Sequence, residues 1–567
     1  MGSAALYVVA TGSLSVDNSQ FISNTAGSIT SYAPAVVSNS QFYSNTTLGA
    51  AGGGIDLEAT SRPLTLTVTS SQFMSNTSYS GASIYANGGA VTISNTQFVS
   101  NTNTGGAGAG LWYQPFNSIN NVQILSSTFR SNLNGAISIN GGNENPMTIA
   151  DSTFSDNYSD KTTAGIGSGS MALTISHSSF INNLTIANDP GSLNAGGPVY
   201  ITDSLFQNNT GQFAGAMYLG NGGLPIFTDR VANTSILSNT STNWDGGGID
   251  ALVPLIVSDS IISGNVMAAS GHAGGGLYWQ SFGNNLSIQR SLFYNNQAPN
   301  AGSGGGLSIF GNATIVNSTV YSNTSSNDAG IYVGNSSSLT LTNDTLAGNT
   351  ATGLFTSYGN LYVGSATPAA LVNTLLAGGG PKNCGGAIVS LGHNLSSDAT
   401  CPLTATGDLS GTNALLGPLQ DNGGPSFALL PTTDSPAVNN GDNTNCPAVD
   451  QRGVARFLGS ACDIGAVETP YKTAQTINFG ALLAQTTRTA SIQVSASASS
   501  SLVVSFSSLT VSVCTVSGTT VTLLTGGTCT VRASQAGNST YAAAPDVDRS
   551  FLIFDHFLFV PLIVRGS

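Results

Sequence analysis

The chain has 567 residues, of which only 7% are charged, whereas 69 are glycine. Soluble globular domains carry about 25% charged residues, so hydroxyl and amide groups must supply most of this polar surface, as in extracellular proteins built from stacked, uncharged turns. The net charge is −13, and the 13 Lys and Arg residues form no basic cluster. A nucleic-acid-binding protein needs a positive surface, so we exclude that class of function.

The first residues already have the character of a strand. Met1-Gly2-Ser3 leads directly into Ala-Ala-Leu-Tyr-Val-Val at residues 4–9, with no signal peptide before it. We interpret this start as a cut inside a repeat of a longer chain, so the missing export signal does not indicate a cytoplasmic location. No hydrophobic stretch reaches the roughly 20 residues of a transmembrane helix, and we expect no membrane span.

An internal repeat of the form Ser/Thr-x-Phe-x-x-Asn extends over the first two thirds of the chain. Its aromatic slot holds Phe21, Phe42, Phe73, Phe98, Phe129, Phe154, Phe180 and Phe206. Later repeats place mainly aliphatic residues in this slot, namely Ile236, Ile262, Phe293, Val320, Leu346 and Leu375. The Asn recurs as Asn24, Asn45, Asn76, Asn101, Asn132, Asn157, Asn183, Asn209, Asn239, Asn265, Asn296, Asn323 and Asn349. The mean period is about 27 residues, which is typical of a solenoid.

Two further short strands accompany each motif. A Gly-rich step leads into the first, as in Gly274-Gly275-Gly276-Leu277, and the second precedes the Phe motif, as in Leu64-Thr65-Leu66-Thr67-Val68. These segments alternate apolar and polar residues, and no run has a helical period. The sequence therefore predicts an all-β fold, with a right-handed parallel β-helix of about 14 coils and three strands per coil over residues 1–380.

Stacking explains why the motif repeats. Equivalent positions of successive coils lie ~4.8 Å apart in a rod roughly 65 Å long. The Phe side chains then form a continuous core, in which each contributes roughly 1.5–3 kcal/mol by burial. Inward Asn side chains bond to the Asn above and below, which satisfies amides that would otherwise be buried without a partner. We therefore interpret both sets of residues as structural.

The Gly-Gly-Ala/Gly-Ile/Leu and Phe-x-x-Asn signals resemble those of the chlamydial polymorphic membrane proteins, which are β-helical surface passengers associated with adhesion. A more specific match covers residues 411–468. It includes Leu416-Gly417-Pro418-Leu419-Gln420-Asp421-Asn422-Gly423-Gly424-Pro425 and ends at Cys462-Asp463-Ile464-Gly465-Ala466-Val467-Glu468. It closely resembles the end of bacterial choice-of-anchor Q β-helix proteins. This resemblance implies an exported bacterial protein in which residues 381–470 end the β-helix before a variable anchoring region, and it implies no assigned chemistry.

Residues 471–554 contain short alternating strands separated by turn residues, which predicts a small β-sandwich. Gln475-Thr476-Ile477-Asn478-Phe479 and Gln535-Ala536-Gly537-Asn538 are similar to parts of a bacterial immunoglobulin-like repeat. That resemblance implies a stalk or spacer module.

All six cysteines lie in the last third of the chain. They are Cys384, Cys401, Cys446, Cys462, Cys514 and Cys529. Pairing of sequence neighbours gives loops of suitable size for disulfides, and an even count is typical of an oxidising compartment. The spacings match no zinc site. We predict a secreted, cell-surface or extracellular-matrix location and no cofactor.

Residues 555–567 form an apolar tail that is too short to span a membrane. Its candidate assembly residues are Phe557, Leu558, Phe559, Val560, Leu562, Ile563 and Val564. A strand of this kind adds to an exposed sheet edge, and head-to-tail docking onto another copy would build a filament. A sorting tail is the other interpretation.

The alternative to a non-enzymatic protein is a polysaccharide lyase or glycoside hydrolase acting on acidic or neutral glycans. That chemistry needs clustered acidic residues, often with Ca²⁺, plus Lys or Arg, or a carboxylate pair. Asp151, Asp203, Asp229 and Asp259 recur near one place in successive repeats, and we interpret them as turn residues. The four histidines share no repeat position, which argues against a His-based site.

Two other groups have a functional and a structural interpretation. Trp112, Tyr113, Tyr278 and Trp279 follow Gly-rich corners, where outward rings would stack on surface glycans and inward rings would pack between coils. Asp442, Asp450 and Asp463 lack the spacing of a calcium loop, and we assign no metal to them. The sequence thus predicts a rigid, non-enzymatic rod for adhesion or for self-assembly into a fibre or sheath.

Overall fold

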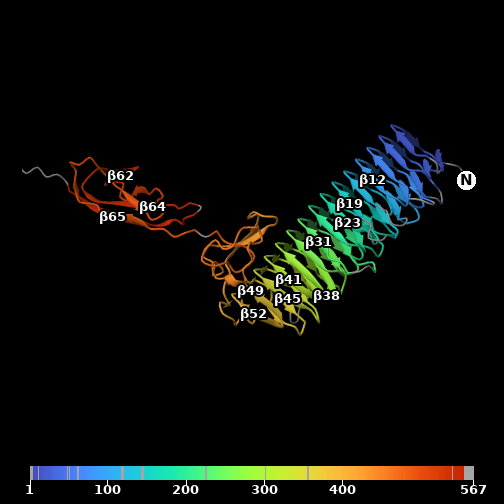
Figure 1. The fold of residues 1–567 in the computed structure, drawn as a ribbon. Coiled ribbons are helices and arrows are strands. Elements are labelled where there is room, and N and C mark those ends of the chain that lie inside the picture. Colours follow the sequence, from blue (N-terminus) through green and yellow to red (C-terminus); the bar gives the residue numbers. More distant parts are fainter. Residues whose placement is uncertain are drawn as a thin grey trace, which may run out of the picture. The chain divides into compact units, whose positions relative to one another are not determined.

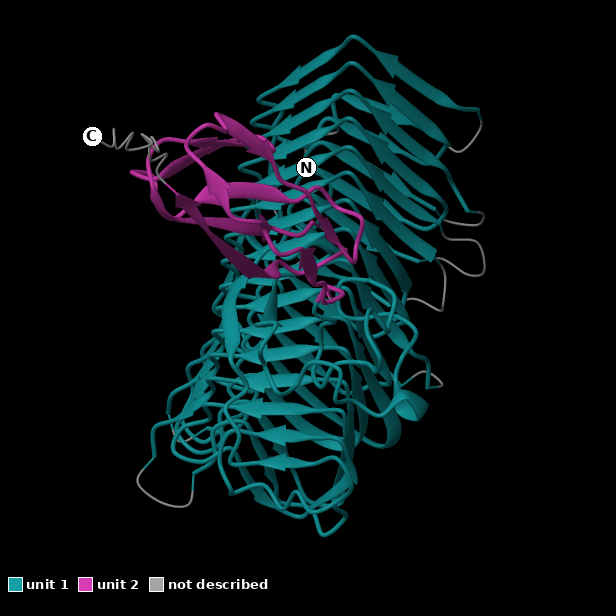
Figure 2. Cartoon of the chain, turned by 90° about the vertical axis from the view of Figure 1, so that its left-hand side faces the viewer, with its two compact units in different colours: residues 1–469 teal, residues 470–567 magenta. Residues whose placement is uncertain are grey.

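The computed structural model divides the chain into two compact units, residues 1–469 and 470–567 (Figure 2). It describes residues 4–9, 12–47, 49, 51–59, 63–106, 108–115, 121–141, 146–223, 226–300, 302–353, 357–470, 472–538 and 540–554. The first unit contains a parallel β-helix of about 14 turns, and the second contains antiparallel sheets (Figure 1). The predicted fold class is therefore confirmed.

Coils in the middle of the β-helix contain four strands, one of which was not predicted. In one coil these are β11 (Ile84–Asn87), β12 (Val91–Ser94), β13 (Gln97–Val99) and β14 (Thr102–Asn103). β11, β12 and β13 pair in parallel with their equivalents in the next coil, so that Val91 lies beside Val122 and Phe98 beside Phe129, whereas β14 pairs with β10 (Thr77–Ser78) of the preceding coil. The expectation of three strands was wrong because a two-residue strand is too short to show an alternating pattern.

The first strand of each coil follows the Gly-rich step, and these strands together form one face of the β-helix. They include β7 (Ile55–Glu58), β11, β15 (Leu111–Gln114), β18 (Ile137–Ile139), β22 (Ile166–Gly167), β26 (Leu193–Ala195), β30 (Met217–Leu219), β34 (Ile249–Ala251), β38 (Leu277–Gln289), β41 (Leu307–Val316), β44 (Ile331–Val333) and β48 (Leu361–Val363). β38 and β41 continue into the second strand of their coils. Alternation turns every second residue of these strands to the outer surface.

Two sharp corners flank the Phe-bearing strand of each coil. At the coil of β13 they are Asn95, with φ of 49°, and Ser100, with φ of 55°. Positive φ is uncommon outside glycine and is tolerated best by short polar side chains. This requirement explains why Asn, Asp and Ser recur on both sides of the Phe.

The predicted Phe residues stack through the interior. Successive ring centroids from Phe21 to Phe206 lie 4.4 to 5.0 Å apart, with planes within 7° of parallel. The aliphatic residues continue the same register as far as Leu346. Leu375 does not: Leu346 pairs with Leu376. Thr374 occupies the Ser/Thr position of the motif, which moves the core position one residue further on.

The motif Asn residues form an uninterrupted ladder inside the coils. From Asn24 to Asn349, each Nδ2 donates to Oδ1 of the next Asn over 2.7 to 3.0 Å. The ladder continues through Asn360 and Asn383, both over 2.8 Å, although these two residues lie outside the motif. Each buried amide therefore has a partner, as buried polar groups require.

The Ser or Thr that opens each motif forms a second ladder. The backbone N–H of Ser127 donates to Oγ of Ser152 over 3.1 Å, and the Ser127 hydroxyl donates to the Leu125 carbonyl over 2.8 Å. The hydroxyl thus links one corner to the next and satisfies a backbone group at a turn. This role explains why Ser or Thr occupies the first position of the repeat, which the sequence pattern alone did not explain.

The parallel stack extends beyond the predicted boundary at residue 380. β51 (Cys384–Gly386) pairs with β48, and β52 (Ile388–Gly392) pairs with β49 (Ala369–Val372). β53 (Leu395–Ser396) and β54 (Leu409–Ser410) follow in the sheet of Phe-bearing strands. These rungs lack the Phe-x-x-Asn motif and lie in residues 381–470, the segment that was expected to end the β-helix.

The segment after β54 packs on the corners of the last coils. It contains the antiparallel pair β55 (Leu416–Gln420) and β56 (Ala428–Pro431) and a 3₁₀ turn, η1 (Asn443–Asn445). Asn317, Asn343 and Asn373, which are corner residues, donate to the backbone oxygens of Val449, Asp463 and Asp442 over 2.8 to 3.0 Å. A buried ion pair of 3.0 Å between Arg456 and Glu468 holds this segment internally.

The second unit has its own core. β61 (Ser505–Ser508), β64 (Gly527–Gln535) and β65 (Ala544–Phe554) form an antiparallel sheet, and β59 (Ser491–Gln493), β62 (Cys514–Ser517) and β63 (Thr520–Leu523) form another. Phe479, Val531, Phe551 and Ile553 are among its buried side chains. The seven assembly candidates of the tail, Phe557 to Val564, lie outside the described residues.

Candidate functional site

The outer face of the first strands carries a ladder of large and polar side chains, one per coil. The parallel register aligns Tyr85, Trp112, Ser138, Gly167, Asn194, Tyr218, Asp250, Tyr278, Ser308, Tyr332 and Tyr362. Each follows the Ile, Leu or Met that begins the strand after the Gly-rich step. That fixed position is the signal by which the sequence alone reveals this ladder.

The four predicted aromatics divide between the two faces of the sheet. Tyr113 and Trp279 point inward and are fully buried; the Tyr113 hydroxyl donates to the Gly89 carbonyl over 2.6 Å, and the Trp279 indole donates to the Val253 carbonyl over 2.8 Å. Trp112 is on the outer face but only 9% exposed, stacked on Tyr85 at 4.6 Å. Tyr278 is the one of the four that stays half-buried at the surface.

A continuous row of aromatic rings crosses the later coils. Centroid distances are 5.5 Å from Tyr278 to Phe310, 5.9 Å from Phe310 to Tyr332 and 6.0 Å from Tyr332 to Tyr362. Tyr358 extends the row, 5.2 Å from Tyr362, and the Lys382 ammonium lies 5.7 Å from its ring. Half-buried rings on rigid strands offer apolar area and hydroxyl groups together, which suits contact with amphipathic ligands.

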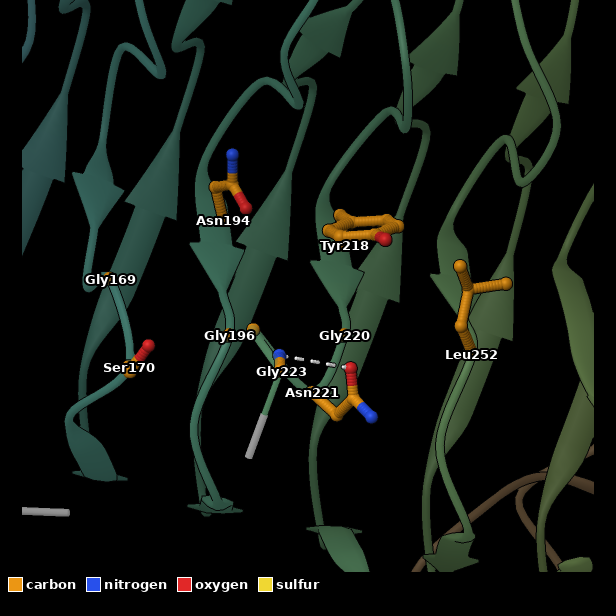
Figure 3. Close-up of a pocket in the computed structure, with 10 residues that line it drawn as sticks. Gly169, Ser170, Asn194, Gly196, Tyr218, Gly220, Asn221, Gly223 and Leu252 are labelled. Atoms are coloured by element: carbon orange, nitrogen blue, oxygen red, sulfur yellow. Dashed lines mark hydrogen bonds between the residues drawn. The ribbon is translucent and has the colours of Figure 1, made fainter. Parts of the chain in front are cut away.

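Two neighbouring hollows lie further toward the N-terminus, and both are lined by Asn194 and Tyr218. The larger, of about 340 Å³, is bounded by Ser170, Asn221, Leu252 and glycine backbone (Figure 3). The smaller, of about 190 Å³, is bounded by Asn188, Asp189, Pro190 and Phe213. In Figure 3 the Tyr218 ring projects from its strand between Asn194 and Leu252. The two hollows therefore lie on either side of the Tyr218 ring, which belongs to the ladder.

Hydrogen bonds and burial fix the polar groups around Tyr218. Asn194 donates from Nδ2 to Oδ1 of Asp189 over 2.7 Å. Burial raises the pKa of the Asp189 carboxyl, although this hydrogen bond opposes the shift. Beneath Tyr218 in the register, Asp250 is 4% exposed, and its Oδ1 lacks a partner among the described residues. Burial, with the charge of Asp245 second, holds the pKa of Asp250 well above its usual range.

An aromatic cluster extends from the smaller hollow to the next coils. Phe213 meets the Tyr218 ring edge-on at 5.0 Å and lies 5.8 Å from Trp244. The Trp244 indole donates to Asn188 over 2.9 Å and meets His272 at 5.3 Å. His272 in turn lies 3.4 Å from the Asp245 carboxylate. None of these residues belongs to the Phe-x-x-Asn motif, and sequence reasoning missed them.

The recurring aspartates do not form an acidic stripe. Asp151, Asp203 and Asp259 all occupy the corner before the Phe-bearing strand, with φ of 51 to 53°, so the turn interpretation is correct for them. It is wrong for Asp229, which begins β31 (Asp229–Ala232), is buried, and accepts a hydrogen bond from the Val199 N–H over 2.8 Å. Asp229 is anchored to the preceding coil instead of turning the chain.

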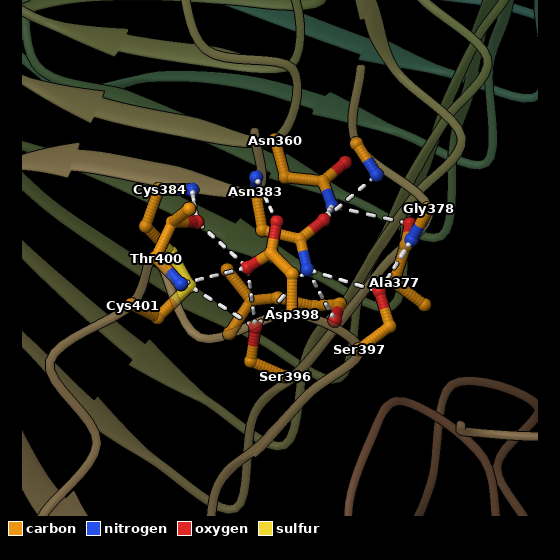
Figure 4. The surroundings of a disulfide bond; sticks show 12 residues. Asn360, Ala377, Gly378, Asn383, Cys384, Ser396, Ser397, Asp398, Thr400 and Cys401 are labelled. Carbon is orange, nitrogen blue, oxygen red and sulfur yellow. Dashed lines mark hydrogen bonds between the residues drawn. A yellow bond between two sulfur atoms is a disulfide. The ribbon is translucent and has the colours of Figure 1, made fainter. Parts of the chain in front are cut away.

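The structure forms two of the three disulfides that neighbour pairing predicts. Cys384 is joined to Cys401, and Cys514 to Cys529. Around the first bond, Asp398 accepts hydrogen bonds from Thr400, Asn383 and Ser396 (Figure 4). Burial would raise the pKa of Asp398, but these bonds bring it below its usual value. The bond therefore lies in a polar network that fixes the last rungs.

The third predicted disulfide is not formed: Cys446 and Cys462 are free thiols, although their side chains are hydrogen-bonded to each other. The Cys462 sulfur is held by the last coil, accepting from Asn373 Nδ2 and donating to the Asp442 carbonyl, each over 3.6 Å. A hydrogen bond with Cys462 lowers the pKa of the half-buried Cys446 thiol.

The three aspartates of the terminal segment all have protein partners. Asp450 binds Arg452 at 2.6 Å, Asp463 accepts from the N–H of Asn439 over 2.7 Å, and Asp442 caps η1 through Thr444. Where the structure describes the chain, no three His, Cys, Asp or Glu residues come together as metal ligands. The described residues also include no apolar helix of membrane-spanning length.

The fold and the outer ladder define a parallel β-helix protein with an aromatic surface. Comparisons with family models, with curated proteins and with solved structures find no match.

Proposed function

We propose that the chain is an extracellular, non-enzymatic surface protein whose β-helix is a rigid adhesive rod. The observation that carries this proposal is the row of aromatic rings from Tyr278 to Tyr362, presented on the outer face over successive coils. A stiff, periodic surface of this kind binds extended partners through many weak contacts at once, and such multivalency raises overall avidity without any single strong site.

An extracellular location is supported by the two disulfides and by the low charge content. Disulfides persist in oxidising compartments and are rare in the cytosol. The likeness of residues 411–468 to choice-of-anchor Q proteins supports a bacterial exported protein, and the likeness of the second unit to immunoglobulin-like repeats supports a spacer.

Beads coated with the full chain test the adhesive proposal. The beads are tested on a panel of immobilised neutral and acidic polysaccharides and matrix proteins, and we expect them to bind at least one of these surfaces. Beads coated with residues 470–567 alone serve as the comparison. If the coated beads bind none of the surfaces above the level of albumin-coated beads, adhesion is contradicted.

Self-assembly remains a proposal that rests on the sequence of the tail. Electron microscopy of the full chain beside a version ending at Phe554 tests it. The end point must lie at Phe554, because Phe551 and Ile553 are buried in the core of the second unit. Filaments from the full chain and single rods from the shortened one are the expected outcome; single rods from both would remove this function.

A glycan-cleaving enzyme is a second candidate, favoured by one pair of carboxylates. Asp56 and Glu58 lie on the same outer face of β7, and Glu58 accepts from Asn87 over 3.1 Å. Burial, with the charge of Glu58 second, raises the pKa of Asp56 to about 8. Glycosidases pair a carboxylic acid of raised pKa with an ionised carboxylate. New reducing ends from a polysaccharide, abolished by Asp56→Asn, would establish this function in place of adhesion.

A further inference from the structure

We propose that Asn194 and Tyr218 form the centre of a binding site for a neutral sugar chain, which crosses the outer face of β26 and β30. This inference rests on the proposed adhesive function and assigns it a location and a class of ligand. It concerns the two hollows that share these residues.

The shape of the surface favours an elongated ligand. The hollows of about 340 Å³ and 190 Å³ lie against the same ring and the same amide. The larger reaches the lower size range of small-molecule pockets, about 300–1,000 Å³. A ligand that fills both hollows must pass over Asn194 and Tyr218 on β26 and β30, so a chain of at least two sugar units fits better than a single one.

Close backbone packing makes the wall of the larger hollow rigid. Gly169, Gly196 and Gly222 lie in successive coils, and a Cβ added to Gly222 would come within 2.7 Å of the Gly196 carbonyl. Close packing of this kind limits rearrangement of the wall, so less conformational entropy is lost when a ligand enters.

The chemistry of the two central residues matches a pyranose. A pyranose presents C–H bonds on its ring faces, which pack against an aromatic ring, and hydroxyl groups at its edge. The planes of Phe213 and Tyr218 are nearly perpendicular, with an interplanar angle of 89°, so the two rings do not stack face to face. Asn194 uses one amide hydrogen on Asp189, which leaves its second hydrogen and its oxygen for sugar hydroxyls.

The lack of positive charge around the hollows selects against acidic sugars. Among the residues that the structure describes, neither lining contains Lys or Arg, and the smaller hollow contains Asp189. The chain as a whole carries a net charge of −13. A carboxylated or sulfated glycan would therefore meet no counter-charge, whereas a neutral or N-acetylated one needs none.

Trp244 provides a built-in probe of occupancy. It is 41% exposed and contacts Phe213, which lines the smaller hollow, whereas Trp112 and Trp279 are 9% and 0% exposed. The chain has only three tryptophans. A ligand at this site should therefore change the fluorescence of Trp244 with little contribution from the other two.

The test is a fluorescence titration of the full chain with cellotetraose, N-acetylchitotetraose and tetragalacturonate. We expect saturable binding of at least one neutral tetrasaccharide, and binding of tetragalacturonate at least tenfold weaker. Tyr218→Ala and Asn194→Ala should each weaken the neutral ligand about tenfold or more. Tyr200→Ala is the matched control, because Tyr200 is 45% exposed on β27 (Val199–Thr202), the second strand of the coil of β26, and lines neither hollow.

Three outcomes would overturn the site. They are no binding of either neutral ligand, equal binding of tetragalacturonate, and unchanged binding by Tyr218→Ala with an unaltered melting temperature. Asn194→Asp adds a variant that keeps the shape of the side chain but removes its donor, and it should also weaken binding. If the coated beads of the adhesion test still bind other surfaces, only the proposed sugar site is contradicted. If they bind no surface, the adhesive function is contradicted as well.

Discussion

The side-chain amide of Asn132 donates to Oδ1 of Asn157 over 3.0 Å, and the backbone N–H of Asn132 donates to the same oxygen, also over 3.0 Å. The Oδ1 atom of Asn157 therefore joins two neighbouring coils through two hydrogen bonds. The arrangement recurs with the motif, so the cohesion of the β-helix depends on contacts that repeat from each coil to the next.

Asn132→Ala should destabilise the β-helix clearly. It leaves the Phe98 carbonyl without the amide that it accepts over 3.0 Å and removes the acceptor of Asn101. Each buried polar group left without a partner costs about 1–3 kcal/mol. Thermal unfolding followed by circular dichroism should show a lower Tm. The exposed Asn140→Ala is the control, and an equal Tm for both variants would contradict the ladder's role.

Phe129→Ala should destabilise by roughly 3–5 kcal/mol, because it opens a cavity in a close-packed stack. The ring lies 4.4 Å from Phe98 and 4.9 Å from Phe154 and is fully buried. Phe282→Ala, at a side chain that is 59% exposed, should change the unfolding free energy by less than about 1 kcal/mol. Denaturant titration compares the two, and a similar loss in both would argue against a continuous aromatic core.

The two free thiols should differ in reactivity. Cys446 is half-buried and its pKa is lowered, whereas Cys462 is buried and its pKa is raised, first by the hydrogen bond with Cys446. The thiolate is the reactive form. Iodoacetamide should therefore label Cys446 in the native protein and both residues only after unfolding. Peptide mass spectrometry that finds residues 446 and 462 joined would contradict the free pair.

The stability of the β-helix should fall as the pH rises from about 4 to about 8. Burial raises the pKa of Asp56 and Asp229 to about 8 and that of Asp328 to about 7, from 3.8. The folded chain thus holds protons that the unfolded chain releases, so this stability is full below the unfolded pKa and is lost as pH passes the folded value. Asp229→Asn should flatten the decline in Tm, unlike the exposed Asp434→Asn. A Tm that rises over this interval would contradict the assignment.

Periodicity made the β-helix predictable, because Phe129 and Asn132 occupy positions that each coil must fill in the same way. The fourth strand escaped prediction because a two-residue strand carries no periodic signal, and the rungs of Cys384 and Leu395 were expected only from the resemblance of their segment, since coils without the motif carry no such signal either. The partnering of Cys462 with Asn373 depends on a contact between distant segments, which spacing cannot reveal.

The candidate site was only partly visible in the sequence. The chain reveals aromatics after Gly-rich steps, but not whether a ring points inward like Trp279 or outward like Tyr278; one residue of register decides this. Asn194 and Tyr218 differ in type, and only their common position after the Gly-rich step links them in the sequence. They are brought together only by the parallel pairing of β26 with β30.

Retention of the full chain on an insoluble neutral polysaccharide, with soluble sugar measured in the same supernatant, would decide between an adhesive rod and an enzyme. An adhesive rod remains bound, is released less readily than its Tyr218→Ala variant, and produces no new reducing ends over hours. Soluble sugar that accumulates with time and disappears in Asp56→Asn would contradict the account.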